Sequence, residues 1–529
     1  MDAKELILSG KTALGIEFGS TRIKGVLVDY EGHVLASGWH EWENSLINGV
    51  WTYSLEEVDE GLKACYSALR KDVESKYGVT PKTFGAIGIS AMMHGYIALD
   101  KDDKQLAPFQ TWRNTNTTQA ADALTELFDF NIPLRWSVAH LYQRILDKES
   151  HVKNIASVFT LAAYMHYKLT GCKVIGIGDA AGMFPIDSEK LDYDSEMISK
   201  FDNLIRDTGL KLREVFPKVL VAGDDAGKLT PEGANLLDES GNLEAGIPLC
   251  PPEGDAGTGM TATNSVAPRT GNLSAGTSTF AMIVLEHKLS KLHREIDMVT
   301  TPSGFPVAMS HANNGTSDLN AWVNIFHEFC DLMGVKADTG ELFTKLYTHA
   351  LSGDKDCGGL MSYGYYSGEN ITFINEGRPL FARMPSSNFT LANFMRSHLY
   401  SSIGAVKLGM DILLKDEGVK LDLLMGHGGL FKTPLVMQKF LAAAVNSPVS
   451  VMATASEGGA WGIALLAAYL VDGKRTGKLE DYLNQRVFKG LTGEAVSPDP
   501  EDVKGFEEFT KRYVAALEAE KAAINSMNW

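Results

Sequence analysis

A carboxylate flanked by glycines lies near the middle of the 529-residue chain, in the stretch Glu253-Gly254-Asp255-Ala256-Gly257. Glycine has no side chain to crowd Asp255, so the carboxylate can approach a substrate hydroxyl. A carboxylate within hydrogen-bond reach of a hydroxyl can act as the general base that removes its proton. The same residues would equally suit a buried aspartate that caps a helix, so this stretch alone leaves both interpretations open.

A hydroxyl-rich turn follows at Gly276-Thr277-Ser278-Thr279, between two short apolar segments. Glycine permits a tight bend, and successive backbone N–H groups in such a bend form a concave site for an anion. The three hydroxyl groups would add further donors. The turn therefore predicts a phosphate site, although an ordinary hairpin would contain similar residues.

A second copy of this turn lies near the N-terminus. Residues 13–29 are typical of a strand, a Gly-Ser-Thr turn and a second strand with alternating apolar residues. Within them, Phe18-Gly19-Ser20-Thr21 aligns with Ala275-Gly276-Thr277-Ser278, at an offset of roughly half the chain. A fold duplicated end to end would give two facing lobes, each with one phosphate-gripping turn, and these could clamp a nucleotide.

The ordered set of motifs resembles the FGGY carbohydrate kinases, which belong to the actin, Hsp70 and hexokinase-like group. The resemblance covers nearly the whole chain. Its parts, in the family's order, are 15–29, Met92-Met93-His94-Gly95, 167–171, 178–182, Gly254-Asp255, 276–278, 426–429 and Pro498-Asp499-Pro500. Each motif is weak singly, but the ordered set is specific.

The resemblance implies an α/β fold of two duplicated actin-like ATPase lobes (RNase H-like, as in hexokinase, Hsp70 and actin) with a cleft between them. We expect residues 1–267 to form the N-terminal lobe, with the sugar site and the first phosphate turn. We expect residues 268–529 to form the C-terminal lobe, with the second phosphate turn and the adenosine site. Family habit alone suggests a homodimer.

Composition and charge narrow the class of protein. The chain is 44% hydrophobic and 22% charged, as is usual for a globular protein. Its formal net charge of -17 argues against nucleic acid as a partner. No apolar run is as long as a membrane span, and the start has no secretory pattern. Five widely spaced cysteines are typical of free thiols, so we expect a cytoplasmic protein that binds no membrane.

The sugar site is expected at the end of a buried strand over 84–90, where Ala91-Met92-Met93-His94-Gly95 follows. Open α/β sheets place ligands at such carboxyl ends. His94 could hydrogen-bond sugar hydroxyls and Met93 could pack on the apolar face of the sugar. A buried histidine beside a core methionine is the alternative. In the family, pentulose kinases have a Met-His-Gly here that contacts the ketose, whereas glycerol kinases differ.

The sequence departs from the family pattern at two places. Trp112, a further candidate for sugar binding, is followed by Asn114 and Asn116, where the family often has an Asp and an Arg. A sugar contact and a surface loop both remain open for the two asparagines. Glu17 stands where most members have Asp. The longer side chain could reposition or weaken a bound Mg²⁺, which prefers oxygen ligands.

The resemblance assigns roles residue by residue. Asp255 is expected to act as general base on the primary hydroxyl of the sugar, and Glu17, through water, and Asp255 are the candidate Mg²⁺ ligands. The expected ATP-binding residues are Gly19, Ser20, Thr21 and Lys24 from the first lobe, and Gly276, Thr277, Gly315, Gly428 and Gly429 from the second. ATP and Mg²⁺ are thus the expected cofactors.

Further elements of the second lobe follow from periodicity. A helix is predicted after Gly315, through Trp322 and Phe326, and a long one over 389–414. Residues 337–390, rich in Gly, Ser and Tyr, are expected to form loops. A strand over 421–425 should run into Gly426-His427-Gly428-Gly429, which would let a flat ligand approach the backbone.

The leading hypothesis is ATP-dependent phosphorylation of a ketopentose, either L-ribulose or D-xylulose, in carbohydrate catabolism. Overall resemblance leans slightly toward L-ribulose. Another ketose or a polyol is an alternative substrate. An actin-like or Hsp70-like ATPase that acts on protein partners is the alternative class, and it would hydrolyse ATP without sugar. A catalytically silent sugar sensor would have no need of Asp255.

Overall fold

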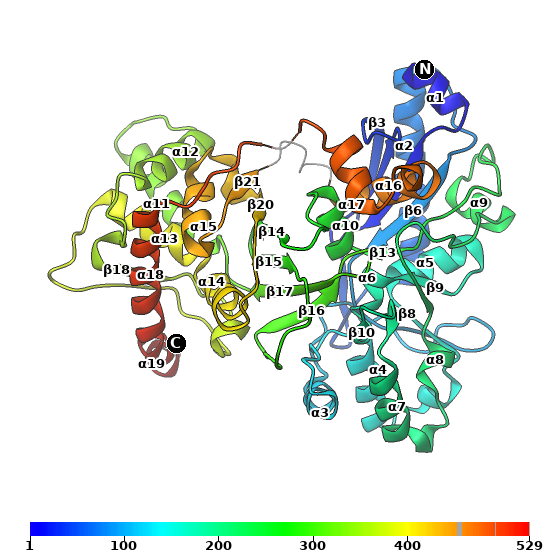
Figure 1. The fold of residues 1–529 in the computed structure, drawn as a ribbon, viewed down its shortest axis with the longest axis horizontal. Coiled ribbons are helices and arrows are strands. Elements are labelled where there is room, and N and C mark those ends of the chain that lie inside the picture. Colours follow the sequence, from blue (N-terminus) through cyan, green and yellow to red (C-terminus); the bar gives the residue numbers. More distant parts are fainter. Residues whose placement is uncertain (452–457, 492, 528–529) are drawn as a thin grey trace. The chain divides into compact units, whose positions relative to one another are not determined.

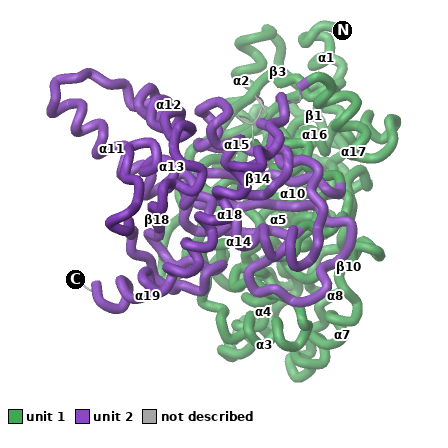
Figure 2. Tube along the Cα trace, turned by 60° about the vertical axis from the view of Figure 1, so that its left-hand side comes forward, with its two compact units in different colours: residues 1–267, 298–307, 456–490 green, residues 268–297, 308–455, 491–529 purple. Residues whose placement is uncertain are grey.

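The computed structural model describes residues 1–451, 458–491 and 493–527. The chain divides into two compact units (Figures 1 and 2). Unit 1 comprises residues 1–267, 298–307 and 456–490, and unit 2 comprises residues 268–297, 308–455 and 491–529. Each unit contains one main β-sheet with helices packed on it, so the fold is α/β.

The sheet of unit 1 has the strand order β13-β6-β1-β2-β3. Strands β1 (Ala13–Phe18), β2 (Arg22–Val28) and β3 (Val34–Glu41) form an antiparallel meander. Strands β6 (Ala86–Ala91) and β13 (Glu253–Gly254) continue the sheet parallel to β1. The short strands β1 and β6 are almost entirely buried, which explains their near-continuous apolar sequences.

Two helices cover opposite faces of this sheet. Helix α2 (Leu55–Tyr77) begins at a capping box on Ser54 and ends at Gly78 in the left-handed conformation. Gly25 approaches its residues Leu69 and Cys65, whereas Gly15 lies against α16 (Gly458–Val471). Because Gly25 pairs with Ile16, the neighbour of Gly15, the two glycines face opposite sides of the sheet.

The remaining helices and strands of unit 1 surround this core. They are α1 (Ala3–Leu8), β4 (Ser45–Ile47), β5 (Val50–Thr52), β7 (Ile97–Leu99), α3 (Thr118–Phe128), α4 (Ser137–Leu146), β8 (Ser157–Phe159), α5 (Leu161–Thr170), β9 (Val174–Gly176), α6 (Ile177–Ala180), β10 (Ile186–Asp187), β11 (Asp192–Tyr193), α7 (Ser195–Leu204), α8 (Leu212–Val215), β12 (Lys218–Leu220), α9 (Pro231–Leu237), α10 (Asp255–Ala262) and α17 (Leu479–Tyr482). Helix α10 packs against α16.

The second main sheet, most of which belongs to unit 2, has the order β16-β17-β15-β14-β20-β21. Its strands are β14 (Thr270–Ala275), β15 (Thr279–Val284), β16 (Ile296–Thr300), β17 (Pro306–Ala312), β20 (Leu423–Gly428) and β21 (Val449–Val451). The other elements are α11 (Ser317–Leu332), α12 (Thr339–Ala350), β18 (Leu360–Tyr363), β19 (Leu380–Arg383), α13 (Leu391–Ser401), α14 (Gly404–Asp411), α15 (Val436–Val445), α18 (Pro500–Ala515) and α19 (Leu517–Ser526).

The two sheets repeat one arrangement. In unit 1 the hairpin β1–β2 has the parallel strand β6 beside its first arm. In unit 2 the hairpin β14–β15 has the parallel strand β20 in the same position. The predicted duplication of a strand-turn-strand motif is therefore present in the structure, with its turn at corresponding places.

Two local predictions for unit 2 were wrong. Residues 337–390 are not all loops, because they contain α12, β18 and β19. Asp338, directly before α12, caps that helix by accepting a hydrogen bond from Glu341 N. The long helix expected over 389–414 is instead α13 and α14. They are separated because Ile403, with φ -120° and ψ 6°, leaves the helical conformation. Among the described residues, no helix is long and apolar enough to cross a membrane.

Candidate active site

Three segments of unit 1 follow strands that end at the same edge of its sheet. Phe18 pairs with Ala91, and Ala91 pairs with Gly254, so the parallel strands β1, β6 and β13 end at the same level. The next residues are the first phosphate turn, the loop 92–95 and Asp255. The register thus places the two predicted sugar-site segments together, and Met93 N donates a hydrogen bond to Oδ1 of Asp255 at 3.2 Å.

Asp255 is the first residue of α10, directly after Gly254. A side chain at Gly254 is excluded, because a Cβ there would lie 2.1 Å from Cγ of Met93. Asp255 is exposed to solvent. The protein surrounding its carboxylate nevertheless raises the Asp255 pKa through desolvation, while the N–H groups of Met93 and Ala256 oppose that rise. An accessible carboxylate with a raised pKa suits a general base.

The loop 93–95 is held in an uncommon backbone conformation. His94 is 7% exposed and has φ 70°, which only a few per cent of non-glycine residues adopt. Its Nδ1 lies 3.2 Å from the carbonyl oxygen of Gly182, so this nitrogen is the donor. Gly95 also has positive φ, and a Cβ there would lie 2.6 Å from the carbonyl of Gln110. Such strain is found where the surroundings fix a residue for function.

Glu17, the second predicted metal ligand, accepts a hydrogen bond from Ala460 N at the start of α16, at 3.1 Å. Burial first, and the charge of Asp255 second, raise the pKa of Glu17 to about 7. The two carboxylates therefore interact. They fit a hydrated Mg²⁺, which takes only one or two carboxylates from the protein. The described residues contain no group of three or more His, Cys, Asp or Glu that could hold a metal by themselves.

Two buried acids beside Asp255 had no individual role predicted from the sequence. Asp179 is 0% exposed, and its Oδ2 accepts a hydrogen bond from Thr160 at 2.6 Å. Glu253 is 1% exposed and accepts from Gly178 N at 3.2 Å. Burial raises the pKa of Asp179 to about 7 and that of Glu253 to about 8. Asp179 lay in a recognised motif, but burial is the signal that sets these acids apart, and only tertiary structure gives it.

The first phosphate turn joins β1 to β2, with Ser20 and Thr21 at its tip. Gly19 N donates to the carbonyl of Arg22 at 2.9 Å and closes the turn. Lys24 pairs with Glu17 across the hairpin. Trp112, predicted to bind sugar, is 39% exposed, and its Nε1 donates to Oγ of Ser20 at 3.3 Å. The structure therefore brings Trp112 to the predicted phosphate turn.

The predicted nucleotide residues of unit 2 also converge. The N–H of Gly315 donates to the carbonyl of Thr277 at 2.7 Å. Gly428, with φ 101°, pairs with Ala275, the residue before Gly276. A Cβ at Gly428 would lie 2.3 Å from the Ala275 carbonyl, so a side chain is excluded. Gly429 follows with no protein atom near its hypothetical Cβ, which leaves room for a ligand.

Asn114 is a buried structural residue. Its side chain accepts from Trp51 N at 2.9 Å and donates to Trp51 O at 2.8 Å. An aspartate could not donate the second bond, which explains the amide at this position. Asn116 is exposed. The family's acidic and basic pair is thus replaced by one internal contact and one surface residue.

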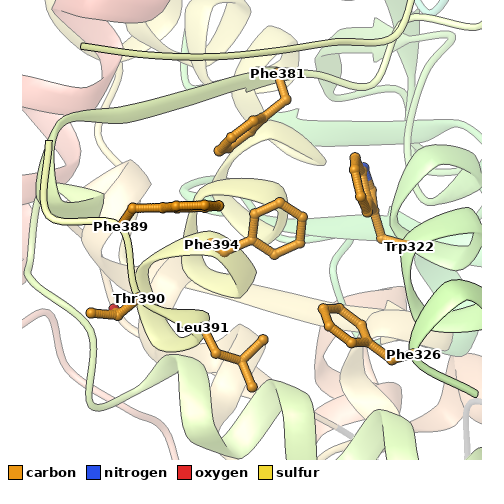
Figure 3. A pocket seen from close by; sticks show the side chains of 7 residues that line it. All are labelled: Trp322, Phe326, Phe381, Phe389, Thr390, Leu391 and Phe394. Carbon is orange, nitrogen blue, oxygen red and sulfur yellow. The ribbon is translucent and has the colours of Figure 1, made fainter. Parts of the chain in front are cut away.

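Unit 2 also has an aromatic pocket of about 380 Å³ (Figure 3). Its lining consists of Trp322, Phe326, Phe381, Phe389, Thr390, Leu391 and Phe394, from α11, β19, α13 and the segment between β19 and α13. The labelled rings point toward one another, and none of the predicted site residues is among them. We assign this pocket no part in the chemistry.

Comparison with known proteins identifies the class. The model of the FGGY family of carbohydrate kinases, N-terminal domain, matches residues 12–259, and the C-terminal domain model matches residues 271–471. The chain therefore belongs to the FGGY family of carbohydrate kinases, and it is a sugar kinase with the two-domain actin-like ATPase fold.

Individual relatives share a quarter or less of their residues with this chain. A xylulose kinase of Haemophilus influenzae is 25% identical over 516 residues, which cover 95% of this chain and 99% of the relative. A ligand-bound xylulose kinase structure from Lactobacillus acidophilus has a TM-score of 0.78 at 17% identity, covering 97% of this chain and 99% of its own. A gluconate kinase structure from the same organism has a TM-score of 0.77 at 17% identity, with coverage of 97% and 98%.

Proposed function

We propose that this protein transfers the terminal phosphoryl group of ATP to a ketopentose in carbohydrate catabolism, with D-xylulose as the first candidate substrate and L-ribulose as the second. The observation that carries the proposal is the hydrogen bond from Met93 N to Asp255, which joins the Met-His-Gly loop to the candidate base. The xylulose kinase relative that spans 95% of this chain supports the order of the two sugars, so the lean toward L-ribulose is abandoned.

The residues divide the chemistry between them. Asp255 holds the attacking oxygen in line and removes the proton from the primary hydroxyl of the ketose as that oxygen attacks the γ-phosphorus. The bond from the γ-phosphorus to the β–γ bridging oxygen breaks, and ADP leaves. Met93, His94 and Gly95 bind the sugar, and Trp112 lies beside both the sugar and the first phosphate turn. Asp255 and, through water, Glu17 would hold Mg²⁺, which when bound would neutralise charge on the phosphate oxygens.

The nucleotide contacts come from both halves of the chain. In residues 1–267, Gly19, Ser20, Thr21 and Lys24 bind the phosphates. In residues 268–529, Gly276, Thr277 and Gly315 bind phosphate, while Gly428 and Gly429 let the adenosine approach the backbone. Turns rich in N–H donors suit this task because phosphates are anions. We also propose a cytoplasmic location, because ATP is an intracellular phosphoryl donor. The proposed oligomeric state is a homodimer.

A substrate panel tests the function. Purified protein with MgATP is assayed for ADP release with D-xylulose, L-ribulose, D-ribulose, glycerol and gluconate. We expect D-xylulose to give the highest kcat/KM. The gluconate arm is included because a gluconate kinase shares the fold equally well. ADP release that no sugar stimulates would contradict the kinase and favour an ATPase acting on protein partners. Light scattering coupled to gel filtration measures the oligomeric state.

A further inference from the structure

The carbonyl groups of the first phosphate turn are all occupied. The carbonyl of Gly19 accepts from Trp42 Nε1 at 2.7 Å, and that of Ser20 accepts from the Tyr53 hydroxyl at 2.6 Å. The carbonyl of Thr21 accepts from Trp42 N at 3.2 Å, and that of Arg22 from Gly19 N at 2.9 Å. Within the described part of the chain, the N–H groups of Ser20 and Thr21 have no acceptor.

This pattern favours an anion at the turn. Free carbonyl oxygens near a phosphate would repel it, whereas carbonyls that accept hydrogen bonds present less negative charge. A backbone whose carbonyl groups already accept hydrogen bonds and whose N–H groups are unpaired presents a surface that binds anions. Two of the donors are the Trp42 and Tyr53 side chains, and a third side-chain donor, Trp112 Nε1, reaches Oγ of Ser20 at 3.3 Å.

The three donors come from separate parts of unit 1. Trp42 follows β3, and its position opposite Thr21 follows from the pairing of Arg22 with Glu41. Tyr53 follows β5 and stacks on Trp42 at 4.1 Å between ring centroids, with 25° between the planes. Tyr53 is 1% exposed, and burial raises its pKa to about 12, so its hydroxyl stays a donor at neutral pH.

In unit 2 the carbonyl groups of the second phosphate turn accept hydrogen bonds from a different kind of donor. The carbonyl of Gly276 accepts from Thr316 N at 3.1 Å, and that of Thr277 accepts from Gly315 N at 2.7 Å. Backbone amides of an adjacent loop therefore do in unit 2 what aromatic side chains do in unit 1. Two carbonyl groups of the first turn accept from side chains, and these donors can be removed by substitution without altering the backbone.

We propose that Trp42, Tyr53 and Trp112 are positioning residues for ATP. Trp42 and Tyr53 hold the carbonyl side of the Gly19–Arg22 turn and Trp112 holds the Ser20 hydroxyl, so that the Ser20 and Thr21 amides receive a phosphate group. The inference rests on the proposed kinase function. Trp112 also connects this support to the sugar loop, because Gln110, two residues before it, pairs through its backbone with Tyr96, next to Gly95.

Removal of one hydroxyl tests the proposal. Tyr53→Phe deletes the donor to Ser20 and keeps the ring stack. We expect the KM for ATP to rise about threefold to tenfold, as for one lost neutral hydrogen bond, with the KM for the ketose within about twofold of wild type. Trp42→Phe should raise the KM for ATP at least as much, since it deletes the donor to Gly19.

Matched controls separate positioning from general stability. Tyr77→Phe removes a tyrosine hydroxyl that donates to the carbonyl of Leu35 at 2.9 Å, and Trp461→Phe removes an indole that donates to Gly32 at 2.8 Å. Both should leave the KM for ATP unchanged. A Tyr53→Phe enzyme with wild-type ATP affinity, or with both KM values raised equally, would overturn the inference.

Calorimetric titration with ATP in the absence of sugar keeps this test independent of the reaction. If wild type phosphorylated no ketose, the proposed function would fail, yet weaker ATP binding by Tyr53→Phe than by Tyr77→Phe would still support the positioning role. If wild type phosphorylated a ketose and the two variants bound ATP equally well, only the positioning role would fail.

Discussion

The backbone N–H of Met93 donates to Oδ1 of Asp255 at 3.2 Å, although the two residues are 162 positions apart in the chain. This bond exists because the strands that precede the two residues, β6 and β13, are parallel neighbours in register. It fixes one oxygen of the candidate base beside the loop proposed to hold the sugar. The position of the base is therefore set by the sheet, and its chemistry by the carboxylate.

Replacement of Asp255 by Asn should abolish most of the catalysis. The amide keeps the size of the side chain but cannot take a proton, so kcat should fall by about 10²- to 10⁴-fold, the usual share of general base catalysis. ATP affinity measured by calorimetry in the absence of Mg²⁺ should stay close to wild type. Asp207→Asn, at a side chain that is 98% exposed, is the control for loss of one carboxylate. Full turnover by Asp255→Asn would remove Asp255 from the mechanism.

Glu253 should make the stability of the protein fall as pH rises. Its folded-state pKa of about 8 exceeds the ordinary 4.5, so the folded protein binds the proton more tightly than the unfolded chain. The stabilising contribution is fully present below pH 4.5 and is lost as pH rises through about 8.

Thermal unfolding of wild type and Glu253→Gln between pH 5 and pH 9 would measure this effect. The amide cannot ionise, so the melting temperature of the variant relative to wild type should increase with pH. For one proton, the free energy of unfolding cannot change by more than about 1.4 kcal/mol per pH unit. Glu126→Gln, at an exposed position on α3, is the control. Parallel curves for wild type and Glu253→Gln would show that Glu253 does not carry the buried proton.

Gly315→Ala should disrupt the second phosphate turn. The new Cβ would lie 2.4 Å from the Gly276 carbonyl oxygen and 2.7 Å from Oγ1 of Thr279, and backbone atoms cannot yield cheaply. We expect a loss of about 1–3 kcal/mol in the free energy of unfolding, as for overpacking, together with weaker ATP binding. Denaturant unfolding and calorimetry would measure the two effects. Wild-type values for both would show that the turn does not need this glycine.

Gly429→Ala should separate ligand contact from folding. Its Cβ would meet no protein atom within 4 Å, so stability should change by no more than about 0.5 kcal/mol. If adenosine approaches this backbone, the methyl group should raise the KM for ATP several-fold while the KM for the ketose stays constant. An unchanged KM for ATP would place the adenosine elsewhere. The same variant is the steric control for Gly315→Ala.

The local motifs of both units were predictable from the sequence. The Gly-Ser-Thr and Gly-Thr-Ser turns between apolar strands and the strand before Met93 are dictated by near neighbours, because φ preferences and alternation act over a few residues. The breaks were harder to predict. The end of α13 at Ser401 and the helix α12 have weak local signals, so their sequences predict a long helix and a loop instead.

By itself, the sequence determined the family, the duplicated hairpins and the aspartate of Gly254-Asp255-Ala256-Gly257, since these depend on residue type and order. Only the tertiary structure decided that Trp42, Tyr53 and Trp112 converge on one turn, that Asn114 holds Trp51, and that Asp179 and Glu253 are buried beside Asp255. These contacts join distant segments. Strand register and burial fix them, and neither is encoded in any short stretch of the chain.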